Sequence, residues 1–265
     1  RHQVQAALGG VVGKISVLKD QSKNHLDVPL EDTMKFAREA DGTEAFGGYA
    51  YLGHNDVIAP VFAAGKSWTM ETVIIPTTVS GQKTLLSKGD YLTTLRQQNA
   101  NLSFHISNGS SWYATDTNDS TAFTSEEQAN FVGKQHRITA MYDYTEGTLS
   151  IYYDGELHTT KNVGQVDIAS SVNEAQQLCI GIDPQNTDRI GDAKYVSVRL
   201  FNKALSADEA KTGLTADNES TVLWLDASKR ASLDVDLSYL ELAAGKAAEA
   251  NAHATDYKEI SNAVK

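Results

Sequence analysis

Five polar or aromatic side chains are predicted to project outward from β-strands. Arg96, His105, Arg137 and Tyr152 each alternate with apolar residues, so they lie on the strand face that points away from the core. Trp112 follows a turn in polar sequence, where a core tryptophan would be unusual. If these strands share a sheet, all five converge on one surface suited to a sugar, which needs an aromatic face and polar groups. The alternative is an ordinary solvated sheet face.

Three carboxylates offer a second chemistry. Glu39, Asp41 and Glu44 have the Glu-x-Asp-x-x-Glu spacing with which some glycoside hydrolases direct carboxylates from one strand into a cleft. However, Asp41-Gly42 is typical of a turn, which would turn these side chains away from a common face. No nucleophile signature, HExxH motif or phosphate-binding loop accompanies them. Catalysis by these residues is therefore the less favoured hypothesis.

A third group of residues suggests a metal. Asp90, Asp183 and Asp188 fall in predicted loops at strand ends, and calcium binds loop carboxylates and carbonyl oxygens. They lack a dense run of alternating aspartates, so turn formation is the simpler interpretation. Calcium is the one cofactor that the sequence suggests.

The elements that position these residues are strands. Residues 133–157 show an apolar alternation of period two, then a Gly-containing turn, then a second alternation. Strand, turn and strand without an intervening helix predict an antiparallel sheet. In a later segment Ser206 is a natural helix N-cap, with Glu209 three residues on. Further strands are predicted at 11–19, 67–76, 83–97, 101–107, 176–184, 195–201 and 221–226. By their pattern, Trp68 and Trp224 belong to the core.

Several of these segments resemble one family. Gln135-His136-Arg137-Ile138-Thr139, Tyr142-Asp143 and Tyr152-Tyr153-Asp154-Gly155 are similar to the central hairpin of bacterial laminin-G-like domains, although Gln135 replaces the usual Trp. YVSVRLFNKALSADEAK, residues 195–211, is the strongest match. The resemblance covers residues 11–227 and implies an all-β, two-sheet antiparallel jelly-roll sandwich of the concanavalin A-like kind. In that family the strands that carry the five outward residues share one concave sheet.

The C-terminal segment differs in composition. From about residue 233 it is Ala-rich, and Leu240, Ala243, Ala244, Ala247 and Ala250 have helical spacing. It resembles the beginning of a FIVAR-type helical repeat. The predicted organisation is therefore a sandwich at 1–227 and a helical extension or linker at 228–265, which we expect to be either incomplete or packed on the sandwich.

Composition excludes some partners. The 265 residues carry a net charge of −11, which disfavours nucleic acid and anionic membranes as partners. The single Cys179 lies in an apolar strand pattern and indicates a buried, inert thiol. The start at Arg1 suggests a fragment whose secretion signal is missing. We expect a monomeric module, attached to other domains of the same polypeptide and either secreted or bound to the cell surface.

The resemblance implies a function. We expect a non-catalytic carbohydrate-binding module of a larger secreted bacterial glycoside hydrolase, such as a β-galactosidase, that binds a glycan of unknown identity. One alternative is a structural spacer or protein-adhesion module without sugar affinity. The other is a glycoside hydrolase that uses Glu39, Asp41 and Glu44.

Overall fold

The computed structural model describes residues 12–115, 122–236 and 244–249. The chain divides into two compact units. One comprises Leu18–Arg230, and the other comprises Arg1–Val17 and Ala231–Lys265. All the candidate functional residues belong to the unit Leu18–Arg230. Among the described residues, no helix is both long and apolar enough to cross a membrane.

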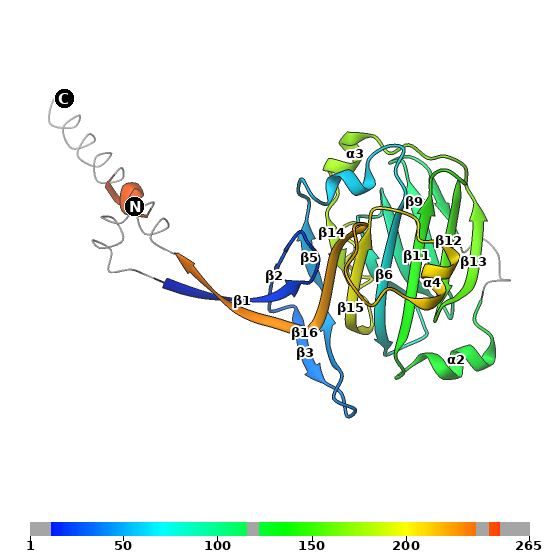
Figure 1. The fold of residues 1–265 in the computed structure, drawn as a ribbon, viewed down its shortest axis with the longest axis horizontal. Coiled ribbons are helices and arrows are strands. Elements are labelled where there is room, and N and C mark those ends of the chain that lie inside the picture. Colours follow the sequence, from blue (N-terminus) through cyan, green and yellow to red (C-terminus); the bar gives the residue numbers. More distant parts are fainter. Residues whose placement is uncertain (1–11, 116–121, 237–243, 250–265) are drawn as a thin grey trace, which may run out of the picture. The chain divides into compact units, whose positions relative to one another are not determined.

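The first of two sheets, called here the large sheet, contains ten strands (Figure 1). Its main path runs β13-β12-β11-β6-β15-β16-β1-β2, and β4 pairs with both β15 and β3. The strands are β1 (Val12–Asp20), β2 (Val28–Pro29), β3 (Met34–Arg38), β4 (Glu44–Gly48), β6 (Trp68–Pro76), β11 (His136–Asp143), β12 (Thr148–Tyr153), β13 (Glu156–Asn162), β15 (Ala193–Phe201) and β16 (Thr221–Asp236). The predicted hairpin is confirmed, because β11 and β12 pair antiparallel.

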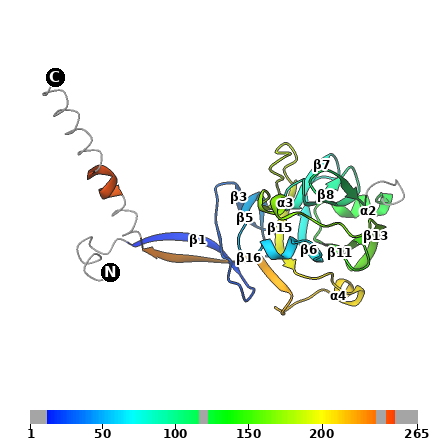
Figure 2. The same ribbon diagram turned by 90° about the horizontal axis from the view of Figure 1, so that it is seen from above.

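The second sheet, called here the small sheet, faces the large sheet (Figure 2). Its strand order is β10-β9-β8-β7-β14-β5. The strands are β5 (Ala50–Gly53), β7 (Gln82–Ser87), β8 (Thr93–Gln98), β9 (Leu102–Ser107), β10 (Trp112–Ala114) and β14 (Leu178–Ile180). Leu95 and Phe104 of the small sheet belong to the same buried cluster as Ile138 and Leu149 of the large sheet. The predicted all-β, two-sheet sandwich is thus confirmed.

Short helices connect the strands. They are the 3₁₀ helix η1 (Ala59–Phe62), α2 (Ser125–Phe131), α3 (Ser170–Glu174) and α4 (Ala207–Thr212). The prediction for α4 is confirmed, because the Ser206 hydroxyl accepts from the Glu209 amide and the Glu209 carboxylate accepts from the Ser206 amide. Helix α2 begins with the same capping box, formed by Thr124 and Glu127.

The closing strand differs from its prediction in two ways. β16 runs to Asp236 rather than ending at residue 226. Trp224, expected in the core together with Trp68, is only partly buried, because Leu223 and Leu225 take the inward positions. The guanidinium of Arg199, the buried cross-strand partner of Trp224, lies 4.2 Å from the indole ring centroid. Trp68 is buried as expected.

The C-terminal prediction is tested at few positions. Residues 244–249 are helical, which agrees with the predicted helical extension at Ala244 and Ala247. Leu240, Ala243 and Ala250 lie outside the described residues. The division at residue 227 stays a prediction.

Candidate functional site

The five predicted ligand-binding residues lie on two different sheets. Arg96, His105 and Trp112 belong to the neighbouring strands β8, β9 and β10 of the small sheet. Arg137 and Tyr152 belong to β11 and β12 of the large sheet. Both groups point away from the shared core, so they lie on opposite sides of the sandwich. The expectation that all five converge is wrong, because a period of two reports which face a residue occupies but not which sheet.

Arg137 and Tyr152 hold helix α4 on the large sheet. Arg137 Nη2 donates to the carbonyl oxygens of Ala210 at 2.8 Å and Lys211 at 3.0 Å, near the end of α4. Tyr152 packs on a small separate hydrophobic cluster that includes Phe201 and Ala210. A guanidinium at the carbonyl end of a helix also complements the helix dipole. Through these contacts both residues stabilise the packing of α4 on the large sheet.

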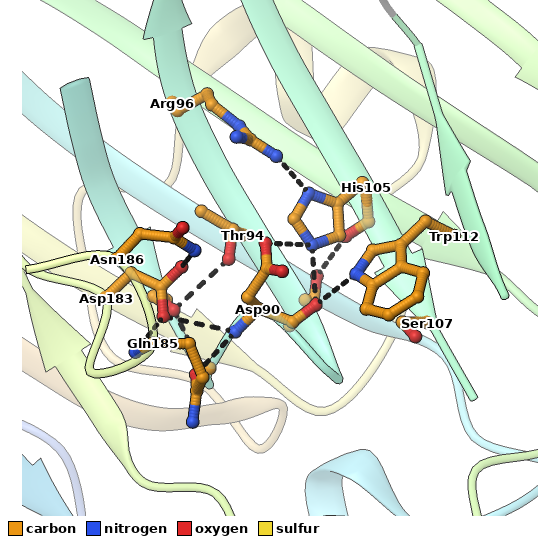
Figure 3. Close-up of polar contacts among 12 residues, drawn as sticks. Asp90, Thr94, Arg96, His105, Ser107, Trp112, Asp183, Gln185 and Asn186 are labelled. Atoms are coloured by element: carbon orange, nitrogen blue, oxygen red, sulfur yellow. Dashed lines mark hydrogen bonds and ion pairs between the residues drawn. The ribbon is translucent and has the colours of Figure 1, made fainter. Parts of the chain in front are cut away.

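Arg96, His105 and Trp112 form one connected network (Figure 3). Arg96 Nη2 lies 2.7 Å from His105 Nδ1, and a guanidinium can only donate, so Nδ1 accepts. The ring proton is therefore on Nε2, which donates to the Asp90 carbonyl oxygen at 3.0 Å. Trp112 Nε1 donates to the same oxygen at 2.7 Å. Three strands thus fix the position of the loop between β7 and β8, which carries Asp90.

The network presents an exposed aromatic pair. Trp112 is 45% exposed and Tyr91 is 41% exposed, and their ring centroids lie 5.4 Å apart at an angle of 53°. His105 is only 1% exposed, so it positions the loop rather than meeting a ligand. Sequence reasoning missed Tyr91, although its place directly after Gly89-Asp90 was a signal that a turn would expose it. The two rings, called here the aromatic pair, offer a surface on which a sugar ring could stack.

The predicted metal ligands are organised differently from a calcium site. Asp183 is buried, and its Oδ1 accepts from the Asp90 amide at 3.2 Å and the Gln185 amide at 3.0 Å. Its Oδ2 accepts from Asn186 Nδ2 at 2.8 Å. Both oxygens therefore face N–H donors, which a cation would have to displace. Asp188 is exposed and takes no part in these bonds.

No metal-binding group replaces the predicted one in the described part of the chain. There, no three His, Cys, Asp or Glu side chains are placed to hold a metal ion. The residues present do not fit the predicted calcium site. Asp90 and Asp183 are instead brought together to shape the loop that carries Tyr91.

Comparison with known proteins identifies the fold. Residues 46–211 match the sequence profile Laminin_G_3, described as the concanavalin A-like lectin/glucanases superfamily. The chain belongs to this superfamily. The resemblance inferred from the hairpin motifs is thereby confirmed. No curated protein matches the chain.

Several solved structures are similar to this lectin-like domain at low sequence identity. A putative carbohydrate binding protein from Bacteroides ovatus is 13% identical with a TM-score of 0.46, covering 80% of this chain. Botulinum neurotoxin type C, whose cell entry depends on interaction with two ganglioside molecules, is 15% identical with a TM-score of 0.49 over 76% of this chain. The binding domain of botulinum neurotoxin DC in complex with SialylT is 12% identical, with a TM-score of 0.50 over 74%. The chain spans about half the length of each, namely 51%, 50% and 50%.

The three carboxylates of the catalytic hypothesis do not share a strand face in this lectin-like domain. Glu39 and Asp41 lie in the turn between β3 and β4, and Glu44 begins β4. The backbone amide of Thr43 donates to Asp41 Oδ1 at 2.9 Å and lowers the pKa of that carboxyl. The hydrogen bond from Arg38, at 2.7 Å, lowers the pKa of Glu44. Because two of the three carboxylates lie in a turn, the three do not project from one strand into a common cleft, as the catalytic hypothesis requires.

A buried lysine anchors the loop of the aromatic pair in the lectin-like domain. Lys88 is fully buried, and its Nζ donates to the carbonyl oxygens of Asn173 at 2.9 Å and Gln176 at 2.7 Å, and to Asn173 Oδ1 at 3.1 Å. Burial lowers the pKa of Lys88 to about 8. Gly89 follows at a φ of 86°, and a Cβ there would collide with Gln176. The loop that ends in Tyr91 is therefore fastened to α3 as well as to β9 and β10.

Proposed function

We propose that this chain is a non-catalytic carbohydrate-binding module whose sugar site is the aromatic pair. The observation that carries the proposal is the exposure of Trp112 and Tyr91 side by side, on a loop that hydrogen bonds hold in place. Exposed aromatic rings with a polar rim are typical of surfaces that bind the C–H face of a pyranose. No catalytic step is assigned to them.

Polar groups beside the pair could orient the sugar hydroxyls. The Asp90 side chain is 22% exposed, and the exposed Gln185 already bonds the Asp90 amide through its Oε1 at 3.0 Å. That bond leaves the Gln185 amide nitrogen available as a donor, and the Asp90 carboxylate can accept. Because hydrogen bonds fix the loop before binding, little conformational entropy is lost on association. A shallow, open site of this kind should bind weakly as a single module.

The superfamily is compatible with this proposal but does not by itself require it, because one fold serves many functions. The neurotoxin binding domain, about half of which is similar to this chain, was solved in complex with SialylT.

We further propose that the module belongs to a larger secreted or cell-surface bacterial glycoside hydrolase. In that setting it would hold the enzyme near its glycan, which raises the local substrate concentration without changing the chemistry. The support is the resemblance of its hairpin and of residues 195–211 to accessory domains of such enzymes.

A glycan array followed by NMR titration tests the sugar site. Trp112→Ala and Tyr91→Ala should each weaken binding of the best glycan at least about tenfold, since stacked aromatics are the usual hot spots of binding. Leu157→Ala is the matched control, because Leu157 is an exposed apolar residue, 53% accessible, on β13 of the large sheet. Its affinity should stay at the wild-type value.

Two results would contradict the proposal. Full-strength binding by Trp112→Ala would place the site elsewhere on the domain. Absence of binding to every glycan by the wild-type protein would favour the spacer or adhesion alternative.

A further inference from the structure

A cavity of about 290 Å³ is lined by residues other than those of the aromatic pair and its loop. Its walls come from the loop after β1, the segment around η1, the residues before β6, and the ends of β15 and β16. The volume is at the lower end of the range for small-molecule sites, which suits a ligand of monosaccharide size. None of its residues takes part in the proposed sugar site.

The charge of this cavity is opposite to that of the chain. Lys23 and Lys66 border it, and the residues that line it, all in the described part of the chain, include no Asp or Glu. The whole chain carries a net charge of −11, so a carboxylate-free opening with two lysines is a local exception. Such an opening attracts anions by its local potential.

The two ammonium groups are available to a ligand in different ways. Lys23 Nζ donates to the Glu219 carbonyl oxygen at 2.7 Å, which fixes its side chain and leaves two further N–H groups. The side chain of Lys66 is exposed, and its ammonium makes no hydrogen bond or ion pair with the residues that the structure describes. A bound carboxylate could therefore be contacted by Lys23, whose side chain is held in one orientation, and by Lys66, whose side chain can adjust to the ligand.

The other residues that line the cavity favour binding of a sugar ring over binding of a small inorganic anion. Val61 and Val222 present apolar surface and are nearly fully buried beneath the opening. Asn24 Nδ2 donates to the Val222 carbonyl oxygen at 2.8 Å, which fixes its amide and leaves its Oδ1 as an acceptor. Asn202 adds a second, exposed amide. Apolar walls with amide groups can contact both the C–H face and the hydroxyls of a sugar.

We propose that this cavity binds an acidic sugar, with the ring against the valines and the carboxylate near Lys23 and Lys66. The inference rests on the proposed sugar-binding function, but it uses residues that the aromatic pair does not share. It assigns the module a second subsite and a preference for glycans that carry a carboxylate.

The test compares matched ligands by NMR titration at fixed ionic strength. The probes are methyl β-glucuronoside and N-acetylneuraminic acid, with methyl β-glucoside as the neutral counterpart and acetate as the bare carboxylate. The methyl groups of Val61 and Val222 should shift with at least one acid and not with acetate. The double variant Lys23→Met/Lys66→Met should weaken acid binding about fivefold, as expected for two exposed ion pairs, and binding should also fall as NaCl is raised.

The control variant removes the same number of positive charges at positions away from the cavity. Lys35→Met/Lys229→Met removes two exposed lysines that do not border the cavity and should leave acid binding at the wild-type level. The inference is overturned if both acids fail to bind, if acetate binds as tightly as they do, or if the two double variants weaken binding equally. Trp112→Ala separates the two proposals, because it should abolish binding at the aromatic pair and leave the cavity shifts intact.

Discussion

The buried Lys88 permits a quantitative prediction about the loop that carries the aromatic pair. Burial lowers the pKa of its ammonium from 10.5 to about 8. The folded protein therefore holds this proton less tightly than the unfolded chain does, and below pH 8 the charged lysine opposes folding. As pH rises from 8 toward 10.5, the unfolded chain still binds the proton and the folded protein does not. The free energy of unfolding should therefore rise across this window.

The size of the effect follows from the shift. A shift of this size corresponds to roughly 3 kcal/mol in total, of which about 2 kcal/mol should be recovered between pH 7 and 9.5. Other groups titrate in the same range. For example, burial raises the pKa of Cys179 to about 12, so ionisation of the unfolded thiol lowers stability above pH 9. A variant without the lysine is needed to separate these contributions.

Lys88→Met provides that variant, because Met preserves the apolar stem and has no proton to lose. Urea unfolding of both proteins from pH 7 to 9.5 should show stability rising for wild type relative to Lys88→Met by about 2 kcal/mol. The variant also removes the lysine donor from the Gln176 carbonyl and from Asn173 Oδ1, which costs about 1–3 kcal/mol for each buried group. That cost does not depend on pH, so it shifts the variant's curve without changing its slope. Equal slopes for the two proteins would refute the reasoning.

Three further changes test other parts of the structure. His105→Gln should weaken glycan binding about tenfold and leave the circular dichroism spectrum unchanged, because glutamine cannot reproduce the imidazole bridge from Arg96 to the loop. Unaltered affinity would show that this bridge does not position Trp112. Arg137→Met should lower the free energy of unfolding by about 2 kcal/mol and speed amide exchange in α4, whose carbonyls it leaves unpaired; exchange at the wild-type rate would contradict this role. Ser206→Ala removes the cap of the same helix and should cost about 1 kcal/mol in thermal unfolding, and a loss well below that would show the cap to be dispensable.

Local patterns predicted much of the fold. The alternation in β8 and β9 correctly assigned Leu95 and Phe104 to the core and Arg96 and His105 to the outer face, since the pleat alone determines that choice. The cap at Ser206 was equally readable, because its hydrogen bonds are local in sequence. Neither inference needed knowledge of which strands are neighbours.

The assignment of each strand to one of the two sheets could not be predicted from local patterns. Between β10 and β11 the chain crosses from the small sheet to the large one, so Trp112 and Arg137 occupy opposite sides although both point outward. An alternating strand looks the same in either sheet, because its period depends on burial of one face and not on its neighbours. The outward face also need not be exposed: His105 is sealed by the loop that it positions, with 1% of its surface accessible.

The aromatic pair depends both on local sequence pattern and on contacts between distant segments, and this explains why only one of its two residues was predicted. Trp112 was identified because a lone indole in polar sequence is unusual. Tyr91 meets Trp112 because the indole donates to the carbonyl oxygen of Asp90, 22 positions earlier in the sequence and directly before Tyr91. No local pattern encodes that contact. The β8, β9 and β10 meander returns the chain to the β7–β8 loop, and Asp183 from a distant segment holds that loop in place. A surface site of this kind is built from contacts between loops, so its residues can be recognised singly in the sequence but assembled only in the folded domain.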